Sequence, residues 1–361
     1  MVRAAFVMEQ HIGHRAYYEN LRRFIDQSSS VEVSWIPITY QHAGILASLP
    51  LLPDHLVGTL SGRSEVRQAL KNATYDVALF NTQVPAAIAG SIVRRKPYVL
   101  CTDITPLQYD EMSEQYGHRA DDGGLLSRYK HWANVNLFRN AAKVLPWSSW
   151  AKASLMADYG VASEQIVVIP PGVDLDVWKP GTAVPDGPLQ ILFVGGDLYR
   201  KGGDVLLQAF RLLPEGCANL HLVTRTSLPP ERGVAVYNTM QPNSPELMAL
   251  YQSAHLFVLP TKAEAFGIAL VEACAVGLPV IATAVGGVTD IVVEGENGFL
   301  TAADDVHALA DHLQQLAANP GLRQQLGWAS RRRAEELFDA RQNAARVAQI
   351  VVESAAGEFH G

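Results

Sequence analysis

Two glutamates, Glu264 and Glu272, lie eight residues apart in a stretch that carries almost no other charge. From residue 265 to residue 289, Glu272 is the only charged side chain. The stretch reads as a buried strand, a polar turn, a helix that Gly267 opens, and a second buried strand. A carboxylate in such surroundings is strongly destabilised unless hydrogen-bond donors satisfy it. Those donors belong either to the protein, through helix capping or a core contact, or to a ligand.

The start of this helix offers a site for an anion. The first amides of a helix have no partner inside it, and they lie at the positive end of its dipole. Here these amides are near Gly267, Ile268 and Ala269. A carboxylate on either side can accept from two hydroxyls of a sugar diol. Polyol, phosphate and polyol in a row describe a sugar nucleotide, so we interpret the two glutamates as ligand-binding residues.

A glycine-rich loop with two cations follows another predicted strand. It runs from Gly195 to Gly203, and it places Arg200 and Lys201 just before a helix. Taken alone, the loop is explained by glycines in a tight strand-to-helix turn and by solvated basic residues. Beside the helix that begins at Gly267, the two cations are predicted to converge on one diphosphate, for which the planar guanidinium of Arg200 is well suited.

Length and composition indicate a globular chain with two domains. The chain has 361 residues, of which 48% are hydrophobic and 18% are charged. Residues 1–179 carry 17 basic and 17 acidic side chains, and the remainder carries 12 and 19. Because no basic stripe appears, nucleic-acid binding is not expected. The short clusters Arg94-Arg95-Lys96 and Arg331-Arg332-Arg333 are interpreted as solvated surface.

The compartment is predicted from the cysteines and from the apolar runs. Cys101, Cys217 and Cys274 are an odd and scattered set, which fits a reducing cytoplasm rather than a disulfide framework. Glu9 interrupts the first apolar run too early for a signal peptide. No run reaches the ~18 residues of a membrane-spanning helix. The sequence does not exclude peripheral contact with a membrane, although the first half of the chain is neutral and therefore does not favour it.

Short apolar runs alternate with amphipathic stretches twice over, which predicts an α/β fold with two doubly wound parallel sheets. Ligands of such sheets bind at the carboxyl ends of the strands. A proline- and glycine-rich stretch at residues 180–188 is the expected linker. The predicted strands are residues 4–8, 31–36, 76–81, 97–102, 143–146 and 165–170, then 190–195, 219–224, 234–237, 255–260 and 278–282; the predicted helices include residues 15–27, 128–142, 202–213, 267–276 and 304–316.

The stretch from Glu264 to Glu272, Glu-Ala-Phe-Gly-Ile-Ala-Leu-Val-Glu, resembles the E-x7-E signature of the retaining GT-B glycosyltransferases of family 4. The resemblance includes Gly286-Gly287 downstream, and Pro170-Pro171-Gly172-Val173-Asp174 and the loop after Gly195 upstream. It covers most of residues 140–350 and is thin over residues 1–135.

The resemblance implies a GT-B fold, in which two Rossmann-like domains face each other across a cleft. The first domain, on the acceptor side, is expected at residues 1–179. The second, which binds the donor nucleotide, is expected at residues 180–338. A C-terminal helix at about residues 339–356 is expected to pack back on the first domain.

The resemblance also implies roles for individual residues of the second domain. Lys201 occupies the place of the lysine that binds the donor diphosphate, Glu272 would bind the ribose, and Glu264 would bind the transferred sugar. Many members carry an arginine directly after the first glycine of the loop, where this chain has Gly196, and Arg200 is the expected substitute. The remaining expected donor-binding residues are Phe266, Gly267 and Ile268.

In the first domain the expected site residues are fewer. Gly13 and His14 lie where related enzymes have a glycine-rich loop on the acceptor side, although an ordinary strand-to-helix loop explains them as well. Asp103 follows a predicted strand, near the place of a histidine in many relatives. It would bind a sugar hydroxyl or, alternatively, cap the following turn. Trp147 and Trp150 are interpreted as core residues.

The predicted function is a retaining hexosyltransferase that moves a sugar from a nucleoside-diphosphate-sugar to the hydroxyl of an acceptor, which is a sugar, a glycan, a lipid-linked sugar or a small molecule. Lys201, Glu264 and Asp103 are the predicted catalytic residues. No cofactor and no metal are expected, because the fixed cations would stabilise the departing diphosphate. Two alternatives remain: a non-catalytic sugar-nucleotide-binding subunit, and a sugar-nucleotide epimerase of the same fold. Nothing in the sequence predicts the oligomeric state.

Overall fold

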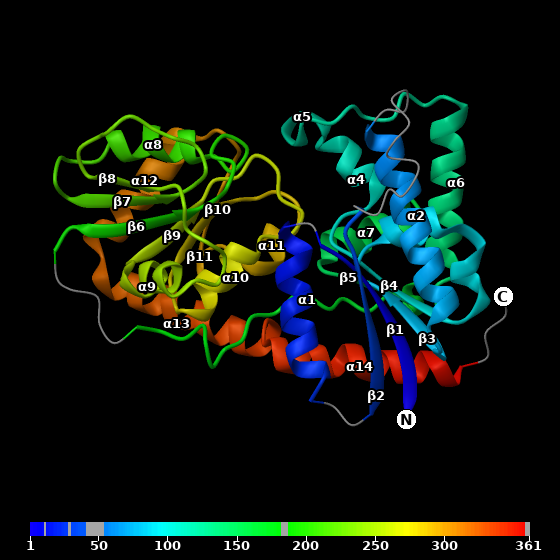
Figure 1. Ribbon diagram of the computed structural model, residues 1–361. Helices are drawn as coiled ribbons and strands as arrows, with labels where there is room; N and C mark the ends of the chain where they lie inside the picture. The colour runs from blue at the N-terminus through cyan, green and yellow to red at the C-terminus, as the bar shows by residue number, and fades with distance from the viewer. Residues whose placement is uncertain (11, 28–29, 41–53, 182–186, 358–361) are drawn as a thin grey trace. The chain divides into compact units, whose positions relative to one another are not determined.

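The computed structural model describes residues 1–10, 12–27, 30–40, 54–181 and 187–357 (Figure 1). The chain forms two compact units. Unit 1 contains Met1–Glu111, Arg119–Pro171 and Ala340–Gly361, and unit 2 contains Met112–His118 and Gly172–Asp339. The main boundary therefore lies at residues 171 and 172, ahead of the predicted 179 and 180. The predicted linker falls partly outside the described residues.

Unit 1 is built on a five-stranded sheet in the order β2-β1-β3-β4-β5. Every pairing in it is parallel. Its strands are β1 (Val2–Glu9), β2 (Val31–Ile38), β3 (Val77–Phe80), β4 (Tyr98–Thr102) and β5 (Lys143–Pro146). Its helices are α1 (Ile12–Ile25), α2 (Asp54–Asn72), α3 (Gln83–Ala89), η2 (Gly90–Arg95), α4 (Pro106–Glu111), α6 (Leu125–Arg139), α7 (Ser149–Ala157), η3 (Ser163–Gln165) and α14 (Ala340–Ala356).

Helices cover both faces of this sheet, as the buried apolar strands require. The final helix α14 packs against α1 and contacts β1, β3 and β4 on one face. The helices α2, α3 and α6 form a second group, in which α3 contacts both of the others; α2 and α6 are labelled in Figure 1. The C-terminal helix therefore completes the fold of unit 1, although all of Gly172–Asp339 separates it in sequence from the rest of that unit.

Unit 2 is built on a six-stranded sheet in the order β11-β10-β9-β6-β7-β8. This sheet is also parallel throughout. Its strands are β6 (Leu189–Val194), β7 (Ala218–Val223), β8 (Val234–Tyr237), β9 (Leu256–Leu259), β10 (Val280–Thr283) and β11 (Gly298–Thr301). Its helices are α5 (Ser113–Tyr116), α8 (Gly203–Arg211), α9 (Pro245–Ser253), α10 (Ile268–Ala275), α11 (Val288–Ile291), α12 (Val306–Ala318) and α13 (Pro320–Leu337).

The strand order of unit 2 reverses between β6 and β9. The chain runs outward from β6 to β7 and β8, and it then returns to place β9 on the other side of β6. The helices α8 and α12 pack together, and so do α10 and α13, which leaves helices on both faces (Figure 1). Ligands of open parallel sheets bind at the carboxyl ends of the strands beside such a reversal. The loops that follow β6 and β9 are the ones that carry the predicted cations and Glu264.

Several sequence predictions differ from the structure. The predicted strand at residues 165–170 is no regular strand: it forms a single bridge, from Ile166 to Val144 of β5. Gly298–Thr301 forms β11, which was not predicted. The Arg331-Arg332-Arg333 cluster is not a solvated run, because Arg331 donates to the carbonyl oxygens of Trp178 and Ala275 and Arg333 donates to those of Asp290 and Ile291.

The helices of the described part of the chain include none that is long and apolar enough to cross a membrane.

Candidate functional site

The loops after β6 and β9 are joined by backbone contacts at the carboxyl edge of the sheet. The carbonyl oxygen of Arg200 accepts a hydrogen bond of 2.9 Å from the amide of Lys262, and one of 3.3 Å from the Thr261 hydroxyl. Gly202 adopts a φ of +73°. A Cβ at this position would collide with the carbonyl oxygen of Pro260. Glycine is therefore required where the first loop passes over the second.

Lys201 and Glu264 come together at this junction. The Lys201 ammonium donates to Oε2 of Glu264, and the two groups form an ion pair. Only 17% of the Lys201 side chain and 10% of the Glu264 side chain are exposed. Two residues that are 63 positions apart in sequence thus form one charged pair beside the strand reversal. The charges of this pair are largely shielded from bulk solvent, which strengthens their interaction with each other and with any ligand.

Arg200 is held beside the pair by other contacts. Its Nη1 donates to the carbonyl oxygen of Ala263 over 3.1 Å. Its guanidinium lies 4.9 Å from the ring centroid of Tyr116, which belongs to α5. Arg200 therefore supports the turn that carries Glu264, so part of its hydrogen-bonding capacity is already used within the protein.

A second glycine pair fixes the same turn from the other side. The amide of Gly287 donates to the carbonyl oxygen of Ala265 over 3.1 Å. Gly286 has a φ of +53°, and a Cβ there would collide with the carbonyl oxygen of Glu264. The Gly286-Gly287 segment, between β10 and α11, thus holds the backbone on which the Glu264 carboxylate is mounted.

Helix α10 begins directly after this turn. Gly267, with a φ of +110°, is its N-cap, and no side chain caps the helix. Among the described residues, no acceptor is found for the amides of Ile268 and Ala269, which leaves them available to an anion. The ring of Phe266 is buried and packs edge-on against Phe338, so only its backbone is available to a ligand.

Glu272 lies on the second turn of α10. Its Oε2 accepts a hydrogen bond of 2.9 Å from the hydroxyl of Tyr251, on α9. Burial raises the pKa of Glu272 to about 7, and the hydrogen bond from Tyr251 opposes part of that rise. Tyr251 is fully buried and stacks on Phe257 of β9. The sequence prediction missed this tyrosine, because one tyrosine on an apolar helix gives no signal beyond core packing.

The three predicted residues of unit 1 also lie close together. His14 is in the first turn of α1, and its Nε2 lies 3.8 Å from Oδ1 of Asp103, just after β4. The ring of His14 lies 5.2 Å from that of Trp147, which is buried as predicted. Gly13, one residue before His14, is exposed and has open space where a Cβ would be. Strand ends of one parallel sheet thus bring together residues 89 positions apart.

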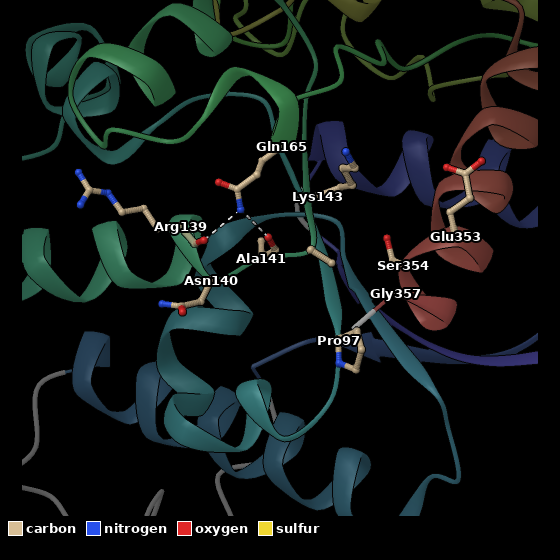
Figure 2. A pocket seen from close by; sticks show the side chains of 10 residues that line it. Pro97, Arg139, Asn140, Ala141, Lys143, Gln165, Glu353, Ser354 and Gly357 are labelled. Atoms are coloured by element: carbon tan, nitrogen blue, oxygen red, sulfur yellow. Dashed lines mark hydrogen bonds between the residues drawn. The ribbon is translucent and has the colours of Figure 1, made fainter. Parts of the chain in front are cut away.

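A pocket of about 380 Å³ lies elsewhere in unit 1 (Figure 2). Gln165 spans part of it, and its Nε2 donates to the carbonyl oxygens of Arg139 and Ala141. Pro97 and Lys143 also line it, and they stand at the amino ends of β4 and β5. This is the edge of the sheet opposite to the one where ligands of such folds bind. None of the predicted site residues lines this pocket.

The part of the chain that the structure describes holds no group of three or more His, Cys, Asp and Glu side chains placed to bind a metal ion.

Comparisons with known proteins agree with this geometry. Two family models match the sequence: Glycosyltransferase Family 4 over residues 27–177, and Glycosyl transferases group 1 over residues 231–333. The D-inositol 3-phosphate glycosyltransferase of Nocardiopsis dassonvillei is 33% identical over 229 residues, with 56% of this chain and 53% of the relative covered. The enzyme of the same name from an Arthrobacter species is 32% identical over 226 residues, with 56% and 54% covered. The chain spans about half the length of these curated relatives.

Solved structures share the fold over almost the whole chain. Sucrose-phosphate synthase from Thermosynechococcus elongatus superposes with a TM-score of 0.80 at 20% identity, and 99% of this chain and 100% of that chain are covered. HepE of Anabaena, in complex with UDP and glucose, gives a TM-score of 0.69 at 18% identity, with 97% and 99% covered. The fold is therefore GT-B. The two family models, the curated relatives and the fold together support a family 4, group 1 glycosyltransferase.

Proposed function

We propose that this protein transfers a sugar from a nucleoside-diphosphate-sugar to an acceptor hydroxyl, with retention of the anomeric configuration and without a metal ion. The observation that carries the proposal is the Lys201–Glu264 pair, which lies beside the strand reversal of unit 2. The pair is partly buried, and Gly267, the N-cap of α10, comes three residues after Glu264.

The donor would bind to unit 2 in three parts. Its diphosphate replaces Glu264 as the main partner of Lys201 and accepts from the amides of Ile268 and Ala269. The ribose diol donates to Glu272, and Glu264 is freed to accept from a hydroxyl of the transferred sugar. Each of these groups is at the carboxyl edge or in the first two turns of α10, and ligands of open parallel sheets bind at that edge, which supports the proposal.

In the proposed reaction the bond between the anomeric carbon and the diphosphate oxygen breaks, and the acceptor oxygen bonds to that carbon. The acceptor proton passes to the departing diphosphate. Negative charge grows on the diphosphate as its bond lengthens, and the ammonium of Lys201 stabilises it in surroundings that exclude most water. When the acceptor attacks from the face that the diphosphate leaves, the new bond forms on the same face as the old one, so the configuration is retained. The acceptor oxygen is then also close to the departing phosphate, which takes its proton directly.

The names of related proteins suggest the first substrates to test. HepE was solved with UDP-glucose, and the curated relatives are named for D-inositol 3-phosphate. We therefore propose UDP-glucose as the first donor and D-inositol 3-phosphate as the first acceptor, with GDP- and ADP-sugars as the next donors. On the acceptor side, the His14–Asp103 pair of unit 1 is the proposed contact with a sugar hydroxyl.

The test measures release of nucleoside diphosphate from UDP-, GDP- and ADP-sugars, with and without acceptor. Lys201→Ala should lower turnover by about 100-fold or more, because one preorganised group at the developing charge is worth that much. Glu264→Ala should also reduce turnover. Dialysis against EDTA should change nothing. Wild-type protein that binds a donor without turning it over would favour a sugar-nucleotide-binding subunit, and conversion of the donor sugar without acceptor would favour an epimerase.

A further inference from the structure

Arg225 is brought beside the glycine-rich loop by an extension of the sheet. It follows β7, which pairs with β6 in parallel up to Val194 and Val223. Beyond the strands the two loops remain joined. The amide of Gly195 donates to the carbonyl oxygen of Val223 over 2.9 Å, and the amide of Arg225 donates to that of Gly196 over 3.2 Å.

The guanidinium of Arg225 lies against Gly196. A Cβ on Gly196 would be 3.2 Å from Nε, 3.3 Å from Nη2 and 3.4 Å from Cζ of Arg225. Nε also points to the carbonyl oxygen of Gly196, at 3.4 Å. The missing side chain of Gly196 thus leaves the space into which the guanidinium fits.

Lys201 flanks the same turn. A Cβ on the neighbouring Gly195 would lie 2.9 Å from Cβ of Lys201. The two glycines therefore separate two cations, Lys201 from the start of α8 and Arg225 from the end of β7. Both stand at the carboxyl edge of β6, the central strand at the reversal.

Arg225 has no acidic partner among the described residues, unlike two arginines at the opposite, amino edge of the same sheet. Arg211 pairs with Glu231 at 2.6 Å, and Arg232 pairs with Glu215. Arg225 is exposed, and its terminal amino groups are not engaged by any described residue. The Nη1 of Arg200, the substitute expected from the sequence, already donates a hydrogen bond to the carbonyl oxygen of Ala263. Among the described residues of this edge, Arg225 is an exposed cation whose terminal amino groups have no hydrogen-bond acceptor.

We propose that Arg225 binds the diphosphate of the donor, and that it supplies from the loop after β7 the guanidinium that Gly196 lacks. The inference rests on the proposed function and adds a residue to it. A planar guanidinium over a glycine turn offers two parallel N–H groups to one phosphate, opposite the ammonium of Lys201.

Binding measurements on the full chain test this directly. Titration calorimetry would use UDP, GDP and ADP, together with uridine, guanosine and adenosine. Arg225→Ala should weaken the preferred diphosphate by about 10- to 100-fold, the range for a lost charge-assisted contact, and leave the matching nucleoside unchanged. Arg225→Lys should recover part of the loss. Arg232→Ala, which removes an exposed arginine at the opposite, amino edge of the same sheet, should have no effect.

A rescue variant separates binding from folding. Gly196 does not have a positive φ, so an arginine can be placed there. Gly196→Arg combined with Arg225→Ala should restore diphosphate binding, because a guanidinium returns to the same edge. If Lys201→Ala weakens binding and Arg225→Ala does not, the inference fails and the proposed function stands. If the wild type binds none of the three diphosphates, both fail.

Discussion

At Glu272 the carboxyl group accepts from the Tyr251 hydroxyl, and burial raises its pKa to about 7. A ribose diol needs two acceptor oxygens, which the ionised carboxylate provides and the protonated acid provides less well. Donor binding is therefore predicted to release a proton near neutral pH. Affinity should rise between roughly pH 6 and pH 8 and then level off, with about a tenfold change per pH unit well below the pKa. Calorimetry over this range measures it.

Glu272→Gln provides the control for this pH dependence. The variant should bind the donor more weakly than the ionised wild type by about 1–3 kcal/mol of binding free energy, and its affinity should not change with pH. The stability of the unliganded protein should depend on pH in the opposite direction to the donor affinity. Because the folded pKa of Glu272 lies above its ordinary value of 4.5, its contribution to stability is full below about pH 4.5 and is lost as the pH rises through 7. The variant should therefore gain stability relative to wild type as the pH rises from about 4.5 to about 7, as chemical unfolding would show.

The Lys201–Glu264 pair predicts a stability effect that is separate from turnover. Lys201→Met keeps most of the apolar stem and removes the ammonium, which leaves the largely buried Glu264 carboxylate without its cation. The free energy of unfolding should fall by about 1–3 kcal/mol. Adding Glu264→Gln should recover part of that loss, because the remaining group is then neutral. A double variant as unstable as the sum of the two single variants would show that the groups do not interact in solution.

At the scale of elements, the glycine turns between strands and helices are expected to affect stability and donor binding as much as the helices do. Gly286→Ala places a Cβ against the carbonyl oxygen of Glu264 in addition to forcing a positive φ. Gly295 has a φ of +71° with nothing within 4 Å of its Cβ position, so Gly295→Ala carries the backbone strain alone. We expect about 1–2 kcal/mol of destabilisation for Gly295→Ala and more for Gly286→Ala. Only Gly286→Ala should also weaken donor binding, as calorimetry on the folded variants would show.

The sequence predicted the elements whose burial pattern is distinctive. Strands such as β9 and β10, buried on both faces, stand out as apolar runs, and the E-x7-E stretch falls on the turn and helix expected of it. The failures also have a physical reason. Strand β11 begins at a glycine that directly follows a polar turn, and it is only four residues long. The segment after Gln165 has a strand composition, but it makes only one bridge to β5.

The contacts within the candidate site were harder to predict. Lys201 and Glu264 could each be named from local pattern, but their pairing depends on β6 and β9 becoming neighbours after the chain has passed through β7 and β8. Arg225 had no local signal at all. Its position beside Gly196 follows from the pairing of β6 with β7, two strands that α8 separates in sequence.

At the scale of the whole molecule, the chain order and the folded units do not coincide. Unit 1 needs α14, whose buried face includes Ala344, Val347, Ala348 and Val351. That face covers α1 and three strands of the first sheet. A fragment of residues 1–171 lacks α14, so it would expose the apolar surface of α1 and of the sheet that α14 covers. Exposing this surface costs roughly 25 cal/mol per Å², and we expect the fragment to remain unfolded or to aggregate. Circular dichroism and light scattering on the fragment would check this.

Unit 2 lacks only Met112–His118 when residues 172–339 are taken alone. This fragment keeps all six strands, both glycine-rich turns, Lys201, Arg225, Glu264 and Glu272, so the proposed donor site should survive in it. The ring of Tyr116 over Arg200 is lost, which weakens a contact worth about 1 kcal/mol. We therefore expect the fragment to fold and to bind the preferred nucleoside diphosphate within about tenfold of the full chain. A cooperatively folded fragment that shows no diphosphate binding by calorimetry would mean that the donor site depends on residues outside this fragment.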